Sequence, residues 1–346
     1  MPKPGKLHRA ALLLTKRFAP KGVILLYHRV AELLSDPQLL CVTPQHFAEQ
    51  VEVLRQVGHP TSLRQLALAL RDGWLPRWGV AVTFDDGYAD NLHNARPLLE
   101  RYGIPGTVFV ASGSLDESRE FWWDELDRLL LQPGTVPGTL HLTINGSIRH
   151  WELGAAVRYT EDAAREHRRW NVLEQVDPTP RQEIYRSLCR CLRPLPVEER
   201  RKVLEDVRRW AGADPACRTT HRPLSVAEVT RLVRGELIDV GAHTVNHPVL
   251  SSLPAGEQRR EIRTSKAHLE DILGRPVASF AYPYGTRSDY TEETMAIVRE
   301  SGFACACSNV PDAIWKDADG FQLPRIVIRD WDGEEFARRL TGWLRG

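Results

Sequence analysis

Two adjacent aspartates, Asp85 and Asp86, stand just after an apolar run that begins at Val80, and Gly87 follows them. The run is typical of a buried strand, so both carboxylates are expected at the mouth of a sheet or barrel. Carboxylates this close raise each other's pKa, and such a pair usually persists because a cation or a proton-transfer role stabilises it. The alternative is a simple turn that caps the next helix, since Asp and Gly are favoured there.

Two histidines separated by four positions, His243 and His247, also follow a predicted strand, residues 237–241. Strand ends of a barrel open onto one face, so these histidines and the aspartates can share a site. Two imidazole nitrogens and one carboxylate leave a divalent ion an open position for water, which suits zinc, with Co²⁺ or Ni²⁺ as alternatives. The second aspartate is then free to act as general base toward that water. A coincidental pair of surface histidines is the alternative.

Segments with strand and helix patterns alternate on both sides of these motifs. The expected strands are residues 23–26, 80–83, 106–111, 237–241, 277–281, 303–307 and 322–328. Amphipathic helical patterns lie between them, and one of these opens at Thr43-Pro44 and ends at Gly58. This alternation predicts an α/β protein with a parallel sheet or barrel.

The middle of the chain has a different character. A helix is expected to start at residues 121–126, a hairpin to turn at Asn145-Gly146, and several strongly charged helices to follow. We therefore expect an N-terminal helix at 1–20, a barrel formed by 21–120 and 236–346, and a mostly helical insertion at 121–235. The arginine-rich runs of the insertion fit solvated helix faces better than a nucleic-acid patch.

The composition narrows the classes of partner and compartment. With 46 basic and 45 acidic residues the net charge is +1, which gives no bulk electrostatic case for nucleic acid. The apolar run at residues 10–14 is too short for a signal-peptide core, so an amphipathic helix is expected, with a cleaved signal or peripheral membrane contact as alternatives. Cys305 and Cys307 are expected to be core residues on one strand, and a cytoplasmic location follows.

Three motifs carry a resemblance to a known family. Thr83-Phe-Asp-Asp-Gly87, His243-Thr-Val-Asn-His247 and Tyr282-Pro-Tyr-Gly285 resemble the first three motifs of the polysaccharide deacetylases, the NodB-homology domains of carbohydrate esterase family 4. The resemblance covers about residues 20–120 and 236–330. It implies a distorted (β/α) barrel that removes N-acetyl groups from amino sugars of a polysaccharide or glycan precursor with the help of a metal ion.

The resemblance also implies roles for single residues. Asp85 would be the catalytic base, and Thr244 would support the ligand loop by a hydrogen bond. Tyr284 would offer its backbone N–H to the oxyanion. The metal ligands would be Asp86, His243 and His247.

The chain departs from the family pattern at three places. Ala281 stands where most members have an arginine that orients the base, and no histidine follows His268 to supply the late general acid. His28 is the candidate replacement, because some exopolysaccharide-associated members are similar in carrying a Tyr-His strand first; a buried structural histidine is the alternative. Trp331 only loosely resembles the substrate-lining tryptophan, and packing on the last helix is equally consistent with its position.

Two other functions compete with deacetylation. One is a related C–N hydrolase acting on a small amide, and the other is a non-catalytic carbohydrate-binding barrel, which the missing arginine at Ala281 motivates. A serine esterase is disfavoured because the chain has no Gly-x-Ser-x-Gly elbow. The expected partner is an N-acetylated glycan, and the oligomeric state is left open.

Overall fold

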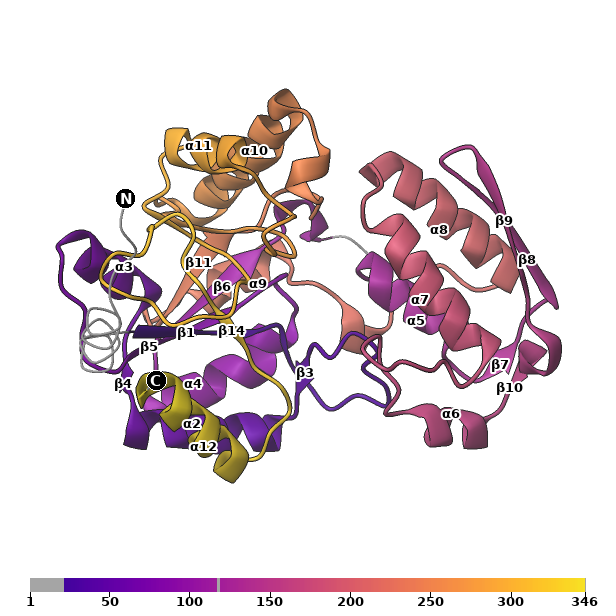
Figure 1. Cartoon of the computed structure of the whole chain (residues 1–346), viewed down its shortest axis with the longest axis horizontal. Coiled ribbons are helices and arrows are strands. Elements are labelled where there is room, and N and C mark those ends of the chain that lie inside the picture. Colours follow the sequence, from indigo (N-terminus) through magenta and orange to yellow (C-terminus); the bar gives the residue numbers. More distant parts are fainter. Residues whose placement is uncertain (1–21, 117–118, 346) are drawn as a thin grey trace, which may run out of the picture.

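A computed structural model of the chain describes residues 22–116 and 119–345, and its centre is a parallel sheet (Figure 1). The expected N-terminal helix at 1–20 lies outside the described residues. The sheet has eight strands in the order β13-β12-β11-β6-β5-β1-β14, with β4 paired to β5. The strands are β1 (Gly22–Tyr27), β4 (His59–Pro60), β5 (Gly79–Phe84), β6 (Gly106–Val110), β11 (Ile238–Ala242), β12 (Ser279–Ala281), β13 (Cys305–Cys307) and β14 (Ile326–Val327).

The segment that leads into β14 brings the two edges of the sheet together. Leu323 forms an isolated parallel bridge with Cys307 of β13, and three residues later Ile326 pairs with Leu25 of β1. The sheet therefore curls into a distorted barrel, as expected, although the predicted strand 322–328 is regular only over the two residues of β14. Arg325 lies in the short stretch where the chain crosses from one edge to the other.

Helices pack around the barrel, and the sequence explains where they begin and end. In α2 the Thr43 side chain accepts a hydrogen bond from the backbone N–H of His46, Pro44 occupies the first turn, and Gly58 ends the helix. The barrel helices are α2 (Pro44–Val57), α3 (Leu63–Arg71), α4 (Arg96–Tyr102), α9 (Val226–Leu232), α10 (Ala255–Leu273), α11 (Glu292–Glu300) and α12 (Gly333–Arg345). No helix within the described residues is both long and apolar enough to cross a membrane.

The insertion forms a second body with its own apolar core beside the barrel (Figure 1). Its elements are α5 (Trp122–Leu130), β7 (Gly134–Thr135), β8 (Thr139–Ile144), β9 (Ser147–Glu152), β10 (Arg158–Tyr159), α6 (Glu161–His167), α7 (Pro180–Leu192) and α8 (Val197–Ala211). The hairpin expected at Asn145-Gly146 is that of β8 and β9. On the barrel side, β2 (Arg29–Val30) pairs with β3 (Cys41–Val42), and the loop between them reaches toward the insertion.

The boundary of the insertion lies earlier than the expected residue 235. Leu224, Val229 and Leu232 belong to the barrel core, so α9 is a barrel helix that leads into β11. The sequence pattern misplaced this helix because its short, charged stretch resembles the helices of the insertion.

The short helical turns of the described residues are η1 (Asn91–Ala95), η2 (Ser112–Ser114), η3 (Gly154–Val157), η4 (Thr219–His221) and η5 (Leu250–Ser252).

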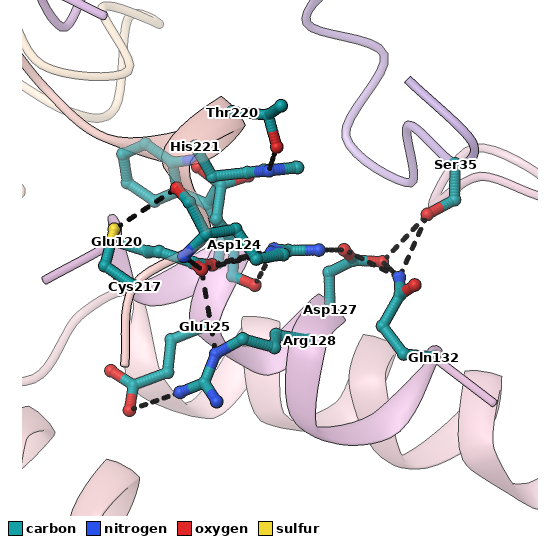
Figure 2. Close-up of polar contacts among 12 residues, drawn as sticks. Ser35, Glu120, Asp124, Glu125, Asp127, Arg128, Gln132, Cys217, Thr220 and His221 are labelled. Atoms are coloured by element: carbon teal, nitrogen blue, oxygen red, sulfur yellow. Dashed lines mark hydrogen bonds and ion pairs between the residues drawn. The ribbon is translucent and has the colours of Figure 1, made fainter. Parts of the chain in front are cut away.

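A buried polar cluster joins the two bodies at the base of α5 (Figure 2). Arg218 donates from Nη2 to Glu120 Oε2 and from Nη1 to Asp127 Oδ2, each at 2.7 Å. Asp127 also accepts a hydrogen bond of 3.1 Å from Ser35, which lies in the loop between β2 and β3. Both carboxylates are nearly inaccessible to water, so their charges depend on the guanidinium for compensation.

We predict that Arg218→Met lowers the free energy of unfolding by ~3 kcal/mol, because two buried carboxylates lose their counter-charge. The matched control is Arg165→Met, which removes an exposed pair with Asp162 and should cost under ~1 kcal/mol. Urea denaturation followed by circular dichroism measures both. Equal costs for the two variants would contradict this account of the junction.

Candidate active site

The residues singled out from the sequence meet at the carboxyl ends of the central strands. Asp85 and Asp86 follow β5, His243 follows β11, and His28 follows β1. They share a cavity of about 330 Å³ at the side of the barrel that faces the insertion. Its lining residues include His28, Asp85, Asp86, Trp122, Trp123, Cys189, Arg193, His243, His247 and Tyr284.

Asp86, His243 and His247 are buried and close enough to hold one ion. Their candidate ligand atoms all lie within 4.8 Å of one another. Oδ1 of Asp86 is 3.6 Å from Nε2 of His243 and 3.3 Å from Nε2 of His247. Nδ1 of His243 lies 2.8 Å from the carbonyl oxygen of Ala281, a contact that turns Nε2 toward Asp86. A nitrogen–nitrogen–oxygen set of this size fits a divalent first-row metal.

The electrostatics of these three side chains also fit a metal. Burial lowers the pKa of His243 to about 4 and that of His247 to about 3, so both imidazoles are neutral and have a free lone pair near pH 7. Burial raises the pKa of Asp86, because its charge has no cation of the protein in direct contact. A bound cation would supply the missing positive charge.

Thr244 fixes the loop that carries both histidines. Its hydroxyl donates to the carbonyl of His243 at 2.5 Å and accepts from the backbone N–H of His247 at 3.0 Å. The side chain is fully buried. This bridge fixes the loop between the two imidazoles.

Left-handed backbone conformations concentrate at this site. Asp86, Thr244, His247 and Tyr284 have φ values of 73°, 64°, 53° and 60°. Non-glycine residues adopt such values at a cost of order 1–3 kcal/mol each, and they persist where the surrounding structure enforces a required side-chain position. The strain therefore marks the strand-end loops as built for the placement of these side chains.

Asp85 is held by a buried arginine that the sequence pattern did not identify. Nη1 and Nη2 of Arg325 donate to the two oxygens of Asp85, each at 2.7 Å, while Nε donates to the carbonyl of Ser308 at 2.9 Å. Burial would raise the pKa of Asp85, but the charge and hydrogen bonds of Arg325 outweigh it and lower the pKa to about 2. The guanidinium expected at Ala281 is thus supplied from the segment that closes the barrel. A lone arginine in the apolar stretch 323–328 was the available signal, since buried arginines require partners.

His28 lines the same cavity from the end of β1. Burial lowers its pKa, while the charges of Asp86 and Asp85 act in the opposite direction. Its own carbonyl accepts a hydrogen bond from Asn91, but its ring forms none with any residue that the structure describes. The alternative of a structural histidine anchored through its ring to the backbone therefore has no partner in this geometry.

Tyr284 sits in a fixed turn with its ring 4.7 Å from that of His247. Asn309 donates from its side chain to the carbonyl of Tyr284 at 2.8 Å and from its backbone to Gly285 at 2.7 Å. The backbone N–H of Tyr284 makes no hydrogen bond within the described part of the chain, which leaves it free to serve as a donor.

The tryptophans near the barrel differ in their surroundings. Trp122 and Trp123 pack in the core of the insertion and also form a wall of the cavity, where Trp123 lies 5.3 Å from the ring of His247. Trp331 is not among the lining residues. It packs against Trp343 at 6.1 Å and lies under the guanidinium of Arg339, so the geometry favours its packing role over a substrate-lining one.

Two segments of the chain are similar in sequence to known deacetylases. Residues 75–136 and 210–306 match the family model described as polysaccharide deacetylase. YxkH of Bacillus subtilis (strain 168) is 28% identical over 127 residues, which are 36% of this chain and 44% of that protein. A poly-beta-1,6-N-acetyl-D-glucosamine N-deacetylase of Escherichia coli (strain K12) is 31% identical over 109 residues, or 31% of this chain and 16% of that protein. The matches thus span less than half the length of these relatives.

Solved structures share the fold at low sequence identity. The Streptococcus pyogenes deacetylase PplD in complex with acetate is 17% identical with a TM-score of 0.57, over 93% of this chain and 99% of that one. IcaB from Ammonifex degensii is 19% identical with a TM-score of 0.57, over 94% and 98%. The sequence match, together with the three strand-end motifs and the barrel, assigns residues 75–136 and 210–306 to the polysaccharide deacetylase family.

Proposed function

We propose that this protein hydrolyses N-acetyl groups of amino sugars in a polysaccharide or glycan precursor, in a metal-dependent reaction. The observation that carries the proposal is the buried Asp86, His243 and His247 set beside an arginine-held Asp85. The similarity to an enzyme named as a poly-beta-1,6-N-acetyl-D-glucosamine N-deacetylase supports an N-acetylated glycan as the substrate class.

Asp86, His243 and His247 would hold a divalent ion, with zinc the best match and Co²⁺ or Ni²⁺ as alternatives. When bound, such an ion polarises a carbonyl oxygen and makes water more acidic. The two imidazoles are already neutral near pH 7 and can bind it without losing a proton, and its charge would oppose the effect of burial on the pKa of Asp86.

Asp85 would accept a proton from the attacking water. The bidentate contact with Arg325 fixes the plane of the carboxylate and keeps it ionised, so one oxygen lone pair remains oriented toward the cavity. As the water oxygen attacks the acetyl carbon, negative charge develops on the carbonyl oxygen. The free backbone N–H of Tyr284 would stabilise that charge, a contribution of about 3 kcal/mol for one well-placed donor.

His28 would complete the reaction as general acid. Its unpartnered ring faces the same cavity, and a protonated imidazole there can pass a proton to the sugar nitrogen as the C–N bond breaks. The products are acetate and a free amino sugar. Asp85 receives one proton in this sequence and His28 gives one, so both must return to their starting states through solvent.

Asp85→Asn should abolish acetate release from an N-acetylated oligosaccharide while the protein retains its metal, because the amide cannot accept the proton. His243→Ala should lose both metal and activity. Enzymatic acetate assay and metal analysis of the purified variants measure the two quantities, with the exposed Asp312→Asn as control. Full activity in Asp85→Asn would exclude it as the base.

Arg325→Met should move the acid limb of the pH profile upward. The pKa of Asp85, about 2 in the intact pair, loses its counter-charge and rises by burial, so the base becomes protonated at a higher pH. Activity present above that pKa is lost as the pH falls through it. The measurement is kcat/KM between pH 4 and 9 with the metal content checked at each pH. An unchanged acid limb would contradict the positioning role of Arg325.

His28→Ala should lower kcat by about 10²–10⁴-fold and remove the alkaline limb that reports loss of the acid proton. The exposed His59→Ala serves as control and should leave the profile as in the wild type. If His28→Ala keeps both the rate and the alkaline limb, the general acid is another group.

Hydrolysis of a small amide remains the competing reaction, and a non-catalytic barrel the competing class. Comparing acetate release from N-acetylated oligosaccharides with hydrolysis of small linear and cyclic amides distinguishes deacetylation of a glycan from hydrolysis of a small amide. Metal retention without turnover of any of these compounds would favour the non-catalytic barrel.

A further inference from the structure

Arg200 of α8 is a buried cation without a counter-ion. Its side chain is only 5% exposed, and Nη2 donates to the carbonyl of Asn246 at 3.1 Å. Nη1 is buried and has no hydrogen-bond partner, and no described carboxylate lies within ion-pair distance. Glu261, which acts on it electrostatically, uses both oxygens for Val245 and Asn246. A buried charge is costly unless it is paired, so this position calls for an anion.

His247 presents a second buried donor next to it. Nε2 faces Asp86, whereas Nδ1 is buried and makes no hydrogen bond. A histidine that binds a metal through one nitrogen almost always donates its other N–H to an acceptor, as His243 can do to Ala281. The two side chains are neighbours, because Arg200 donates to the carbonyl of Asn246, the residue before His247, and both line the same small cavity.

A small cavity of about 80 Å³ lies between these two residues. Arg200, His247, Asn246 and Trp122 are among its lining residues, together with the acids Glu120 and Glu125. Both acids already form ion pairs with other arginines. Glu120 pairs with Arg218, and Glu125 pairs with Arg128, as Figure 2 shows for the latter pair. They cannot neutralise Arg200, and the space exceeds the roughly 30 Å³ that one water occupies.

Two further polar atoms at this place lack partners of normal geometry. Nε1 of Trp122 and the hydroxyl of Tyr284 are both buried and act on each other, but they form no hydrogen bond of normal geometry. The guanidinium of Arg200 lies over the ring of Trp122 at 5.7 Å, and the ring of Tyr284 contacts that of His247. Arg200, His247 and Trp122 thus each bring a buried nitrogen without a hydrogen-bond partner of normal geometry to the lining of one cavity.

We propose that this cavity binds a small monoanion, a halide or a carboxylate the size of acetate, between Arg200 Nη1 and His247 Nδ1. The anion compensates the buried guanidinium and accepts the free N–H of His247, which orients the imidazole toward Asp86. Only the assignment of that N–H to Nδ1 rests on the proposed function, because it presumes that Nε2 binds the metal. Two small monoanions could occupy the site: acetate, as the product of the proposed reaction, and chloride from the medium.

Crystals of the metal-loaded protein soaked in sodium bromide test the site directly. We expect an anomalous peak within hydrogen-bonding distance of Arg200 Nη1 and His247 Nδ1, and a parallel soak in sodium acetate shows whether a carboxylate occupies the same place. Water alone at this position after both soaks would overturn the proposal. The readout needs no turnover, so its failure is distinct from a failure to release acetate from a glycan.

Thermal unfolding tests the site in solution. Chloride, compared with gluconate at equal ionic strength, should raise the Tm of the wild type by about 2–4 °C at saturation. Arg200→Met should lose this rise, whereas Arg209→Met on the exposed face of the same helix should keep it. An equal chloride effect in wild type and Arg200→Met would contradict the proposal. If Arg200→Met does not fold, the bromide soak of the wild type decides.

Discussion

A bidentate ion pair buried in the barrel, between Asp85 and Arg325, is the interaction on which the rest of the site depends. Two charges out of water are stable only with near-ideal geometry and with their remaining hydrogen-bonding groups satisfied. Here Ser308 accepts from the third guanidinium nitrogen, and the backbone N–H of Asp85 donates to Tyr27 of the neighbouring strand. Because Arg325 comes from the closing segment, the ionised Asp85 and the closure of the barrel are stabilised together.

The pair also explains why two adjacent aspartates can have unequal properties. Asp85 has a permanent cation, and its pKa falls to about 2, whereas Asp86 has none in contact, and burial raises its pKa. One carboxylate is therefore ionised whatever occupies the site. Asp86, with the neutral His243 and His247, forms a set of side chains that could hold a cation. The position of one guanidinium thus gives the two carboxylates the different properties that the proposed base and ligand roles require.

The part of the site that could be predicted from the sequence consists of the residues that lie within short motifs at strand ends. Asp85, Asp86, His243 and His247 each follow a strand, and parallel strands bring such residues to one face, so their meeting could be expected. The pairing of Arg325 with Asp85 could not be predicted, because a lone arginine in an apolar stretch indicates a buried partner without identifying it, and the partner is 240 positions away. The α9 boundary was missed, and the two alternatives for Trp331 stayed open, for a related reason: both depend on which body a short charged or aromatic stretch packs against.

The insertion takes part in the site instead of standing apart from it. Trp122, Trp123 and Arg193 form one wall of the cavity, and Arg200 lies behind His247. The buried cluster around Asp127 fixes this wall to the barrel. Substrate discrimination is therefore expected to depend on the relative placement of the two bodies as much as on the strand-end residues.

The most direct test of the central claim is acetate release from an N-acetylated oligosaccharide by chelator-treated protein, titrated with zinc. The account predicts no release without metal and full recovery at one equivalent of zinc per chain. Release that is indifferent to chelation and zinc, or no release at any zinc concentration from any N-acetylated glycan, would contradict it.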